Sequence, residues 1–139
     1  LLALALCLLT GCSSDAGGIP EGLTWMAQVL QSQEDGAILA AASGEDGNRA
    51  VPVLDITAQV EKGEVTLTDH ASGETCTGSL APRADAAPGS QIYTLRFPDR
   101  PEGHAVYGVT EYAGGGREAT LYLTVEQRTL RLTAPLPEE

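Results

Sequence analysis

The chain has 139 residues and a formal net charge of −11, from 19 acidic and 8 basic residues. This length allows one domain of ordinary size, and so strong an acidic excess disfavours nucleic acid and anionic membrane faces as partners. Lys62 is the single lysine and the arginines are scattered along the chain, so we expect no basic groove for a polyanion.

The chain begins with an apolar segment, LLALALCLLTGC, over residues 1–12. Its run of apolar side chains from Leu1 to Leu9 is much shorter than the roughly 20 residues that a membrane-spanning helix needs. A short apolar run followed by small residues is typical of a secretory signal peptide. We therefore interpret residues 1–11 as a signal peptide that lacks its basic n-region, with a buried strand or helix as the alternative.

The end of this segment, Leu9-Thr10-Gly11-Cys12, resembles the lipobox of bacterial lipoproteins. The resemblance implies cleavage before Cys12, with Leu9, Thr10 and Gly11 as the cleavage motif, and a diacylglyceryl group on the Cys12 sulfur. Small side chains leave the backbone accessible to a peptidase, and a thiolate is the nucleophile that accepts the lipid. The resemblance further implies a membrane-anchored protein on the extracytoplasmic side of the bacterial cell envelope, held stably if two acyl chains are attached.

Residues 12–22 follow as a lipidated cysteine and a stretch of small, polar residues that predicts a flexible tether. This leaves residues 23–139 for one β-barrel domain. Once Cys7 has left with the signal and Cys12 carries lipid, Cys76 is the remaining thiol, which excludes an intramolecular disulfide. We expect Cys76 to act as a small buried apolar residue.

Beyond the tether, apolar residues alternate with polar ones in short runs, which predicts an all-β domain. The first two runs, residues 23–31 and 37–43, predict a hairpin around Asp35-Gly36, although their apolar spacing also suits a helix. Further strands are predicted over residues 51–60, 65–69, 75–81, 90–97, 104–112, 119–126 and 129–134. Pro135 and Pro137 are expected to end the last strand.

The alternation within these runs assigns side chains to the interior. Leu54, Ile56, Ala58 and Val60 are expected to face inward from residues 51–60. Further inward residues are expected to be Val65, Leu67, Tyr93, Leu95, Phe97, Leu121, Leu123, Leu130 and Leu132. Small residues that are expected to face inward, at Ala58, Cys76, Gly78 and Gly108, would leave room for a cavity or for close strand packing.

About nine short strands with antiparallel connections predict a single meander that forms a small barrel, with a two-sheet β-sandwich as the alternative. The rhythm of TLTDHASGETCTGSL and GVTEYAGGGREATLYLTV is similar to that of small lipocalin-like envelope lipoproteins, which implies a ligand inside the barrel. The hairpin MAQVLQSQEDGAILAAAS also resembles the start of an oligonucleotide/oligosaccharide-binding barrel.

Catalytic and metal-binding patterns are weak. His70 and His104 would need to meet a carboxylate such as Asp69 or Glu102 to hold a metal, but no HxH or HxxxH spacing exists, so we expect solvated histidines and no metal. No GxSxG motif occurs. The AGGG segment, residues 113–116, predicts a hairpin turn. The two EDG segments predict turns as well, because they lack the alternating oxygen ligands and the closing Glu of a calcium-binding loop. No cofactor is implied.

The expected function is therefore non-enzymatic binding of a small ligand or a protein partner by a lipid-anchored β domain. The alternatives are an accessory or inhibitory subunit of an envelope protein complex and, less favoured, a small metal-dependent hydrolase. Tyr112 and Tyr122 form the candidate binding face, because alternation places Tyr122 opposite the inward face of its strand and exposed aromatics mark interfaces.

Overall fold

The computed structural model describes residues 18–83 and 91–137. The signal and the Leu9-Thr10-Gly11-Cys12 motif lie outside the described residues. The described elements are all β-strands: β1 (Trp25–Ser32), β2 (Ile38–Ala41), β3 (Glu45–Asp46), β4 (Arg49–Ala50), β5 (Ile56–Glu61), β6 (Glu64–Asp69), β7 (Glu74–Pro82), β8 (Ile92–Arg96), β9 (Gly103–Glu111), β10 (Arg117–Val125) and β11 (Arg128–Leu136).

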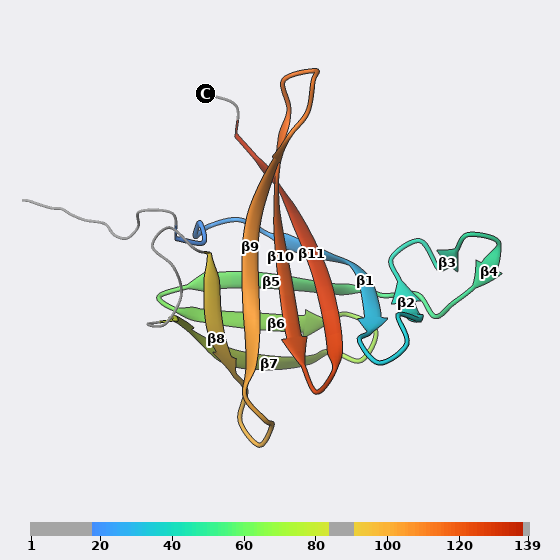
Figure 1. Ribbon diagram of the computed structural model, residues 1–139, viewed down its shortest axis with the longest axis horizontal. Helices are drawn as coiled ribbons and strands as arrows, with labels where there is room; N and C mark the ends of the chain where they lie inside the picture. Colours follow the sequence, from blue (N-terminus) through green and yellow to red (C-terminus); the bar gives the residue numbers. More distant parts are fainter. Residues whose placement is uncertain (1–17, 84–90, 138–139) are drawn as a thin grey trace, which may run out of the picture.

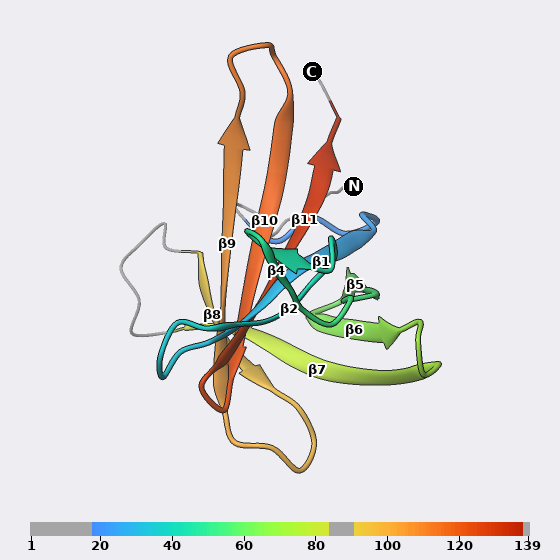
Figure 2. The same ribbon diagram turned by 90° about the vertical axis from the view of Figure 1, so that its right-hand side faces the viewer.

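The strands form a closed antiparallel barrel (Figures 1 and 2). Neighbouring strands follow the chain order from β5 to β11, and β11 then pairs with β1, which also pairs with β5. Eight strands therefore close the ring, with β2 as an additional strand beside β1. The predicted all-β meander and barrel are confirmed. The sandwich alternative is wrong, because the pairing of β11 with β1 closes one continuous sheet on itself.

Strand β1 is shared between two neighbours along one edge. Its first residues, Trp25 and Met26, pair with β5, whereas Val29, Leu30 and Gln31 pair with β2. Its register with β11 shifts between Ala27 and Val29. Such a shift bends a strand and increases its twist. The bend lets β1 leave β5 while it continues along β11.

Tight turns explain why the strands pair in sequence order. The β5–β6 turn has Lys62 at φ 52° and Gly63 at φ 76°, and the β10–β11 turn has Glu126 at φ 53° and Gln127 at φ 66°. Two successive residues with left-handed φ form a two-residue turn whose twist matches the twist of the two flanking strands, which favours a hairpin. The β1–β2 hairpin turns at Asp35-Gly36 as predicted.

The β1–β2 turn is held by its own aspartate. The Asp35 carboxylate accepts a hydrogen bond from the Ala37 amide at 3.0 Å. That bond, with a further one from Ser32, lowers the pKa of Asp35 below its ordinary value. This is the usual way in which an aspartate fixes a turn two residues ahead.

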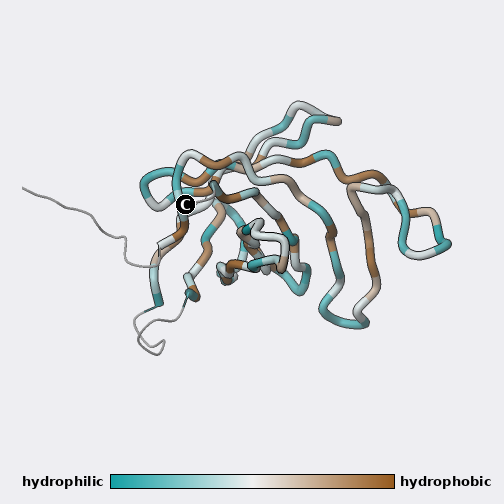
Figure 3. The backbone as a smooth tube through the Cα atoms, turned by 90° about the horizontal axis from the view of Figure 1, so that it is seen from above, coloured by the Kyte–Doolittle hydropathy of each residue, from teal (hydrophilic) through white to brown (hydrophobic). Residues whose placement is uncertain are grey.

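Hydrophobic residues alternate with hydrophilic ones along the strands (Figure 3), and the inward side chains of the strands form one hydrophobic core. Its largest fully buried members are Trp25, Val65, Leu95, Leu121 and Leu132. The rings of Trp25 and Tyr107 meet edge to face, with centroids 6.2 Å apart and planes at 79°. This is a favourable aromatic geometry.

Two parts of the strand prediction were wrong. Residues 51–55 do not continue β5; instead the Ala41 amide donates to the Pro52 carbonyl and the Leu54 amide to the Ala41 carbonyl, which ties this segment to β2. Leu54 is buried all the same. The chain between β2 and this segment forms the small β3–β4 ladder, where Arg49 contacts Asp46 at 2.9 Å.

Pro135 does not end the last strand. Pro135 lies inside β11 and pairs with Glu118 of β10, and the next residue, Leu136, pairs with Arg117. The pairing of β1 with β11 begins only at Met26 and Thr133, so no described residue of β1 pairs with β11 at Pro135. A proline is tolerated at such a strand edge because no partner there requires its missing N–H group.

Candidate functional site

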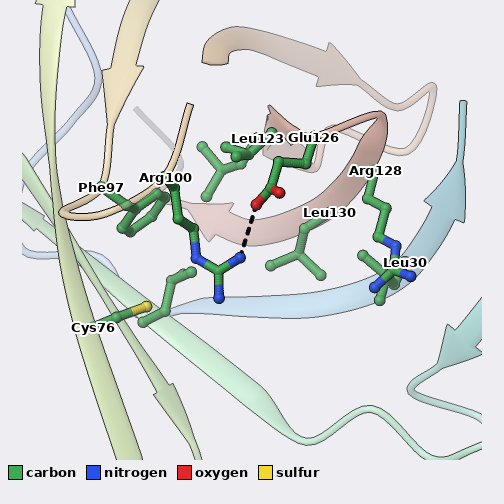
Figure 4. A pocket seen from close by; sticks show the side chains of 10 residues that line it. Leu30, Cys76, Phe97, Arg100, Leu123, Glu126, Arg128 and Leu130 are labelled. Carbon is green, nitrogen blue, oxygen red and sulfur yellow. Dashed lines mark hydrogen bonds and ion pairs between the residues drawn. The ribbon is translucent and has the colours of Figure 1, made fainter. Parts of the chain in front are cut away.

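One end of the barrel holds a pocket of about 480 Å³ (Figure 4). This volume falls within the range of about 300–1,000 Å³ typical of small-molecule sites. Its walls come from β1, β6, β7, the β8–β9 loop and the β10–β11 hairpin. The ten lining residues are Leu30, Leu67, Cys76, Phe97, Arg100, Leu123, Val125, Glu126, Arg128 and Leu130.

The apolar walls are inward positions of paired strands. Leu67 lies opposite Cys76, and Leu130 lies opposite both Leu123 and Leu30. Leu123 and Leu130 belong to the buried core, while Leu30 and Leu67 pack against it partly buried. The apolar surface of the pocket is therefore continuous with the hydrophobic core.

Phe97 forms one wall because Gly78 makes room for its ring. A Cβ atom at Gly78 would lie 2.8 and 2.9 Å from two ring carbons of Phe97 and 3.0 Å from the carbonyl oxygen of Arg96. These separations are too short for ordinary contact. The space beside Gly78 is thus filled by the Phe97 ring. Gly108 was expected to face inward, but it pairs with Thr120 on the outward face of β9 and so leaves no space inside the barrel.

Charged side chains gather at the rim of the pocket. Arg100, from the β8–β9 loop, donates a hydrogen bond from Nη1 to Oε1 of Glu126 at 2.8 Å (Figure 4). Both side chains are substantially exposed, at 62% and 47%. Arg128 also lines the rim, and within residues 18–83 and 91–137 it makes no ion pair. The rim thus offers hydrogen-bond donors beside an apolar wall.

Cys76 lies in the wall of this pocket, which corrects the expectation of a buried thiol. Its side chain points inward on β7 as predicted, but the residue is exposed because the barrel is open here. Partial desolvation raises the pKa of the Cys76 thiol, and the nearby Arg100 guanidinium opposes this by lowering it. A raised pKa keeps the thiol protonated near neutral pH.

Tyr112 and Tyr122 are both exposed, at 53% and 41%. Tyr122 has Val106 and Arg131 as its cross-strand neighbours. Tyr112 follows β9 at the β9–β10 turn, which extends beyond the other strands in Figure 1, and its hydroxyl donates to Glu118 at 2.9 Å. Arg131, the cross-strand neighbour of Tyr122, also acts on the Tyr112 hydroxyl, because its charge opposes the rise in the pKa of Tyr112 that the hydrogen bond to Glu118 causes.

The two histidines sit on different elements. The His70 ring, after β6, is 2.9 Å from the Thr57 hydroxyl through Nε2, while His104 lies on β9 opposite Thr94 and Thr124. Among the described residues, no group of three or more His, Cys, Asp or Glu side chains is placed to hold a metal ion.

Sequence reasoning found the apolar part of the pocket and missed its charged rim. Alternation assigned Leu67, Phe97, Leu123 and Leu130 inward, and all of them line the pocket or its wall. Arg100 and Glu126 lie in a loop and a turn, where no period fixes the direction of a side chain. Only closure of the barrel brings their two connections to the same end.

The part of the chain that the structure describes contains no helix with the length and apolar character needed to cross a membrane. Comparison with protein families, with characterised proteins and with solved structures found no match.

Proposed function

We propose that the protein is a lipid-anchored lipoprotein of the bacterial cell envelope whose barrel binds a small, largely apolar ligand at its open end. The resemblance of Leu9-Thr10-Gly11-Cys12 to a lipobox supports the anchor. The pocket at the end of the barrel supports ligand binding. The tether over residues 12–22 would hold the barrel near the membrane surface.

The single observation that carries the binding proposal is the composition of the pocket. Six of its ten lining residues are Leu, Val or Phe, and its polar groups are confined to Cys76 and the charged rim. The exposed surface of the pocket is divided about equally between polar and apolar atoms, and small-molecule sites combine apolar side chains with a few placed polar groups. An apolar molecule in the pocket would cover the exposed apolar wall. Its binding would be favourable because apolar surface of both the molecule and the wall is removed from water.

The position of Cys76 in the wall provides a direct test. In a chain with Cys7→Ser and Cys12→Ser, Cys76 is the sole thiol and can be alkylated with a maleimide. We expect the neutral apolar fluorophore N-phenyl-1-naphthylamine to bind with increased emission and to slow this alkylation. Unchanged emission together with an unchanged alkylation rate would contradict the proposal.

A matched control separates pocket occupancy from other effects of the fluorophore. Replacing Cys76 by Ser and introducing Ser72→Cys moves the sole thiol to the exposed turn after β6, outside the pocket lining. Alkylation at this position should not respond to the fluorophore. Equal protection at both positions would indicate binding elsewhere on the chain and would count against the pocket.

A second candidate function is an accessory or inhibitory subunit that binds a protein through the outside of the barrel. The observation in its favour is that Met26 and Tyr122 are exposed on the outward face, at 57% and 41%. Exposed apolar side chains are typical of interfaces. Replacement of both residues by Ser should then abolish crosslinking to an envelope partner without altering fluorophore binding.

A further inference from the structure

The charge of the pocket differs in sign from that of the chain. Its lining includes two arginines, Arg100 and Arg128, and one carboxylate, Glu126, whereas the chain as a whole has 8 basic and 19 acidic residues. A local excess of guanidinium groups beside an apolar wall is complementary to a molecule with an apolar body and a negative end. Such a placement is unexpected for a surface that is otherwise strongly acidic.

Arg100 is the better placed of the two arginines. Its guanidinium lies between Cys76 and Glu126 over the pocket (Figure 4), and its charge acts on the Cys76 thiol inside the wall. A guanidinium has five N–H donors, and the contact with Glu126 is made through Nη1 alone. No other residue that the structure describes accepts a hydrogen bond from the remaining donors, so they are available to a second acceptor that approaches from the pocket.

The surroundings of Arg128 make it less suitable for an anion. Besides the pocket, Arg128 lines a neighbouring hollow together with Glu34, Asp35 and Glu126. Glu34 and Asp35 add two carboxylates to Glu126, which lines both hollows, and they would repel a negative head group. This places the expected anion on the Arg100 side of the rim.

The contact between Arg100 and Glu126 is open to exchange. Exposed ion pairs have a small net stability because water competes for both charges, and this pair is exposed on both sides. A carboxylate that binds the guanidinium with two oxygens makes a stronger contact than a single hydrogen bond. An incoming carboxylate can therefore share or replace Glu126 on Arg100 at little cost.

The size of the pocket limits the apolar part of the ligand. A volume of about 480 Å³ lies in the lower half of the range of about 300–1,000 Å³ for small-molecule sites. Leu30, Leu130 and Leu123 are cross-strand neighbours, and Phe97 lines the same pocket. These dimensions suit one aliphatic chain in preference to a lipid with several.

We propose that the barrel binds a single-chain amphiphile with a carboxylate head group, whose chain lies on the Leu30, Leu123 and Phe97 wall and whose head is held by Arg100. This inference rests on the proposed ligand-binding function and names the class of ligand. Arg100 acts as the specificity-determining residue, and Glu126 is the internal carboxylate with which the ligand competes.

The test is displacement of N-phenyl-1-naphthylamine by decanoate and by decan-1-ol, which have chains of equal length and differ in charge. Arg100→Gln should weaken decanoate binding about tenfold, as expected for loss of a hydrogen bond to a charged group, and leave decan-1-ol unchanged. Arg100→Lys should give an intermediate loss for decanoate, because the charge is kept and the planar fork is lost. Glu126→Gln should strengthen decanoate binding about threefold.

Arg49→Gln is the matched control. It removes the same charge from the β3–β4 hairpin, where Arg49 contacts Asp46 outside the pocket, and should leave decanoate binding at its original strength. Equal losses from Arg49→Gln and Arg100→Gln would show a general charge effect and overturn the assignment of the head group.

The outcomes separate this inference from the function on which it rests. Displacement by both compounds with no selective loss in Arg100→Gln would overturn the carboxylate assignment and leave the apolar pocket in place. Absence of fluorophore binding in the unaltered chain would overturn the ligand-binding function and the inference with it.

Discussion

The guanidinium of Arg100 and the carboxylate of Glu126 meet at 2.8 Å across the open end of the barrel. Arg100 belongs to the loop between β8 and β9, and Glu126 begins the turn between β10 and β11. Their contact joins two connections that are separated by the whole length of the β9–β10 hairpin. It places positive and negative charge directly above an apolar wall, which is the arrangement on which the proposed ligand chemistry depends.

The contact of Gly78 with Phe97 predicts that Gly78→Ala lowers stability. The added methyl group would meet the Phe97 ring at 2.8 Å and would force the ring toward the pocket. Overpacking of this kind costs about 1–3 kcal/mol. Urea unfolding should show this loss, and fluorophore binding should weaken because the displaced ring occupies the pocket.

Gly108→Ala is the control for this substitution. Gly108 also lies in a strand, and a Cβ atom there would have no neighbour within 4 Å. Its free energy of unfolding should change by less than about 0.5 kcal/mol, as for an ordinary surface substitution. A Gly78→Ala variant as stable as Gly108→Ala would contradict the close packing of Phe97 on β7.

The β10–β11 turn predicts a stabilising substitution. Gln127 has φ 66°, a left-handed conformation that costs a non-glycine residue about 1–2 kcal/mol and that glycine adopts readily. Gln127→Gly should raise the free energy of unfolding by about 0.5–1 kcal/mol, because glycine's greater unfolded-state entropy offsets part of the gain. Gln59→Gly, within β5, should instead be destabilising. A loss of stability in Gln127→Gly would contradict the turn geometry.

The pH dependence of Cys76 follows from its raised pKa. Because only the thiolate reacts, alkylation near pH 8 should be slower than that of an unfolded cysteine and should continue to rise with pH beyond the ordinary thiol range. Arg100→Gln should slow the reaction further at constant pH, since Arg100 lowers this pKa. An unchanged or faster rate in Arg100→Gln would contradict the proximity of the two groups. Measured rates of maleimide addition across pH 6–10 provide the test.

The sign of the stability effect at Cys76 is also determined. A thiol whose pKa is higher in the folded state than in the unfolded state favours folding while it is protonated. That contribution is complete below the unfolded pKa and is lost as the pH rises through the folded pKa. Cys76→Ser should therefore reduce the loss of stability between neutral and strongly alkaline pH, as measured by urea unfolding. An identical dependence of unfolding free energy on pH in Cys76→Ser and in the unaltered chain would contradict this prediction.

The anchor gives a prediction about Cys12. When the chain is expressed in bacteria behind an initiator Met and a short basic segment, radiolabelled palmitate should be incorporated into the membrane-bound protein. Cys12→Ser should abolish the label, whereas Cys76→Ser should retain it. Label that persists in Cys12→Ser would contradict the lipobox interpretation.

Most of the barrel could be predicted because its information is local. Alternation of Leu121 and Leu123 with Tyr122 determines which face is buried, and turn residues such as Asp35-Gly36 determine where the chain reverses. The failures arose where tertiary context overrides a local rule. Pro135 continues a strand only because no described residue of β1 pairs with β11 at that position.

The charged part of the site could not be predicted from the sequence. Arg100 and Glu126 are distant in sequence and lie in connections without periodicity. Cys76 was correctly assigned to the inward face, but its exposure depends on how far the barrel extends around it. Neither property is encoded in a single strand, because each results from the way the eight strands close.

Mass spectrometry of the protein released gently from its own envelope tests the central claim most directly. Native and denaturing spectra of the same sample separate a covalent lipid, which remains after unfolding, from a bound ligand, which does not. We expect an additional noncovalent mass in the native spectrum that is lost on denaturation and reduced in Arg100→Gln. Identical masses under the two conditions would contradict a ligand-carrying barrel.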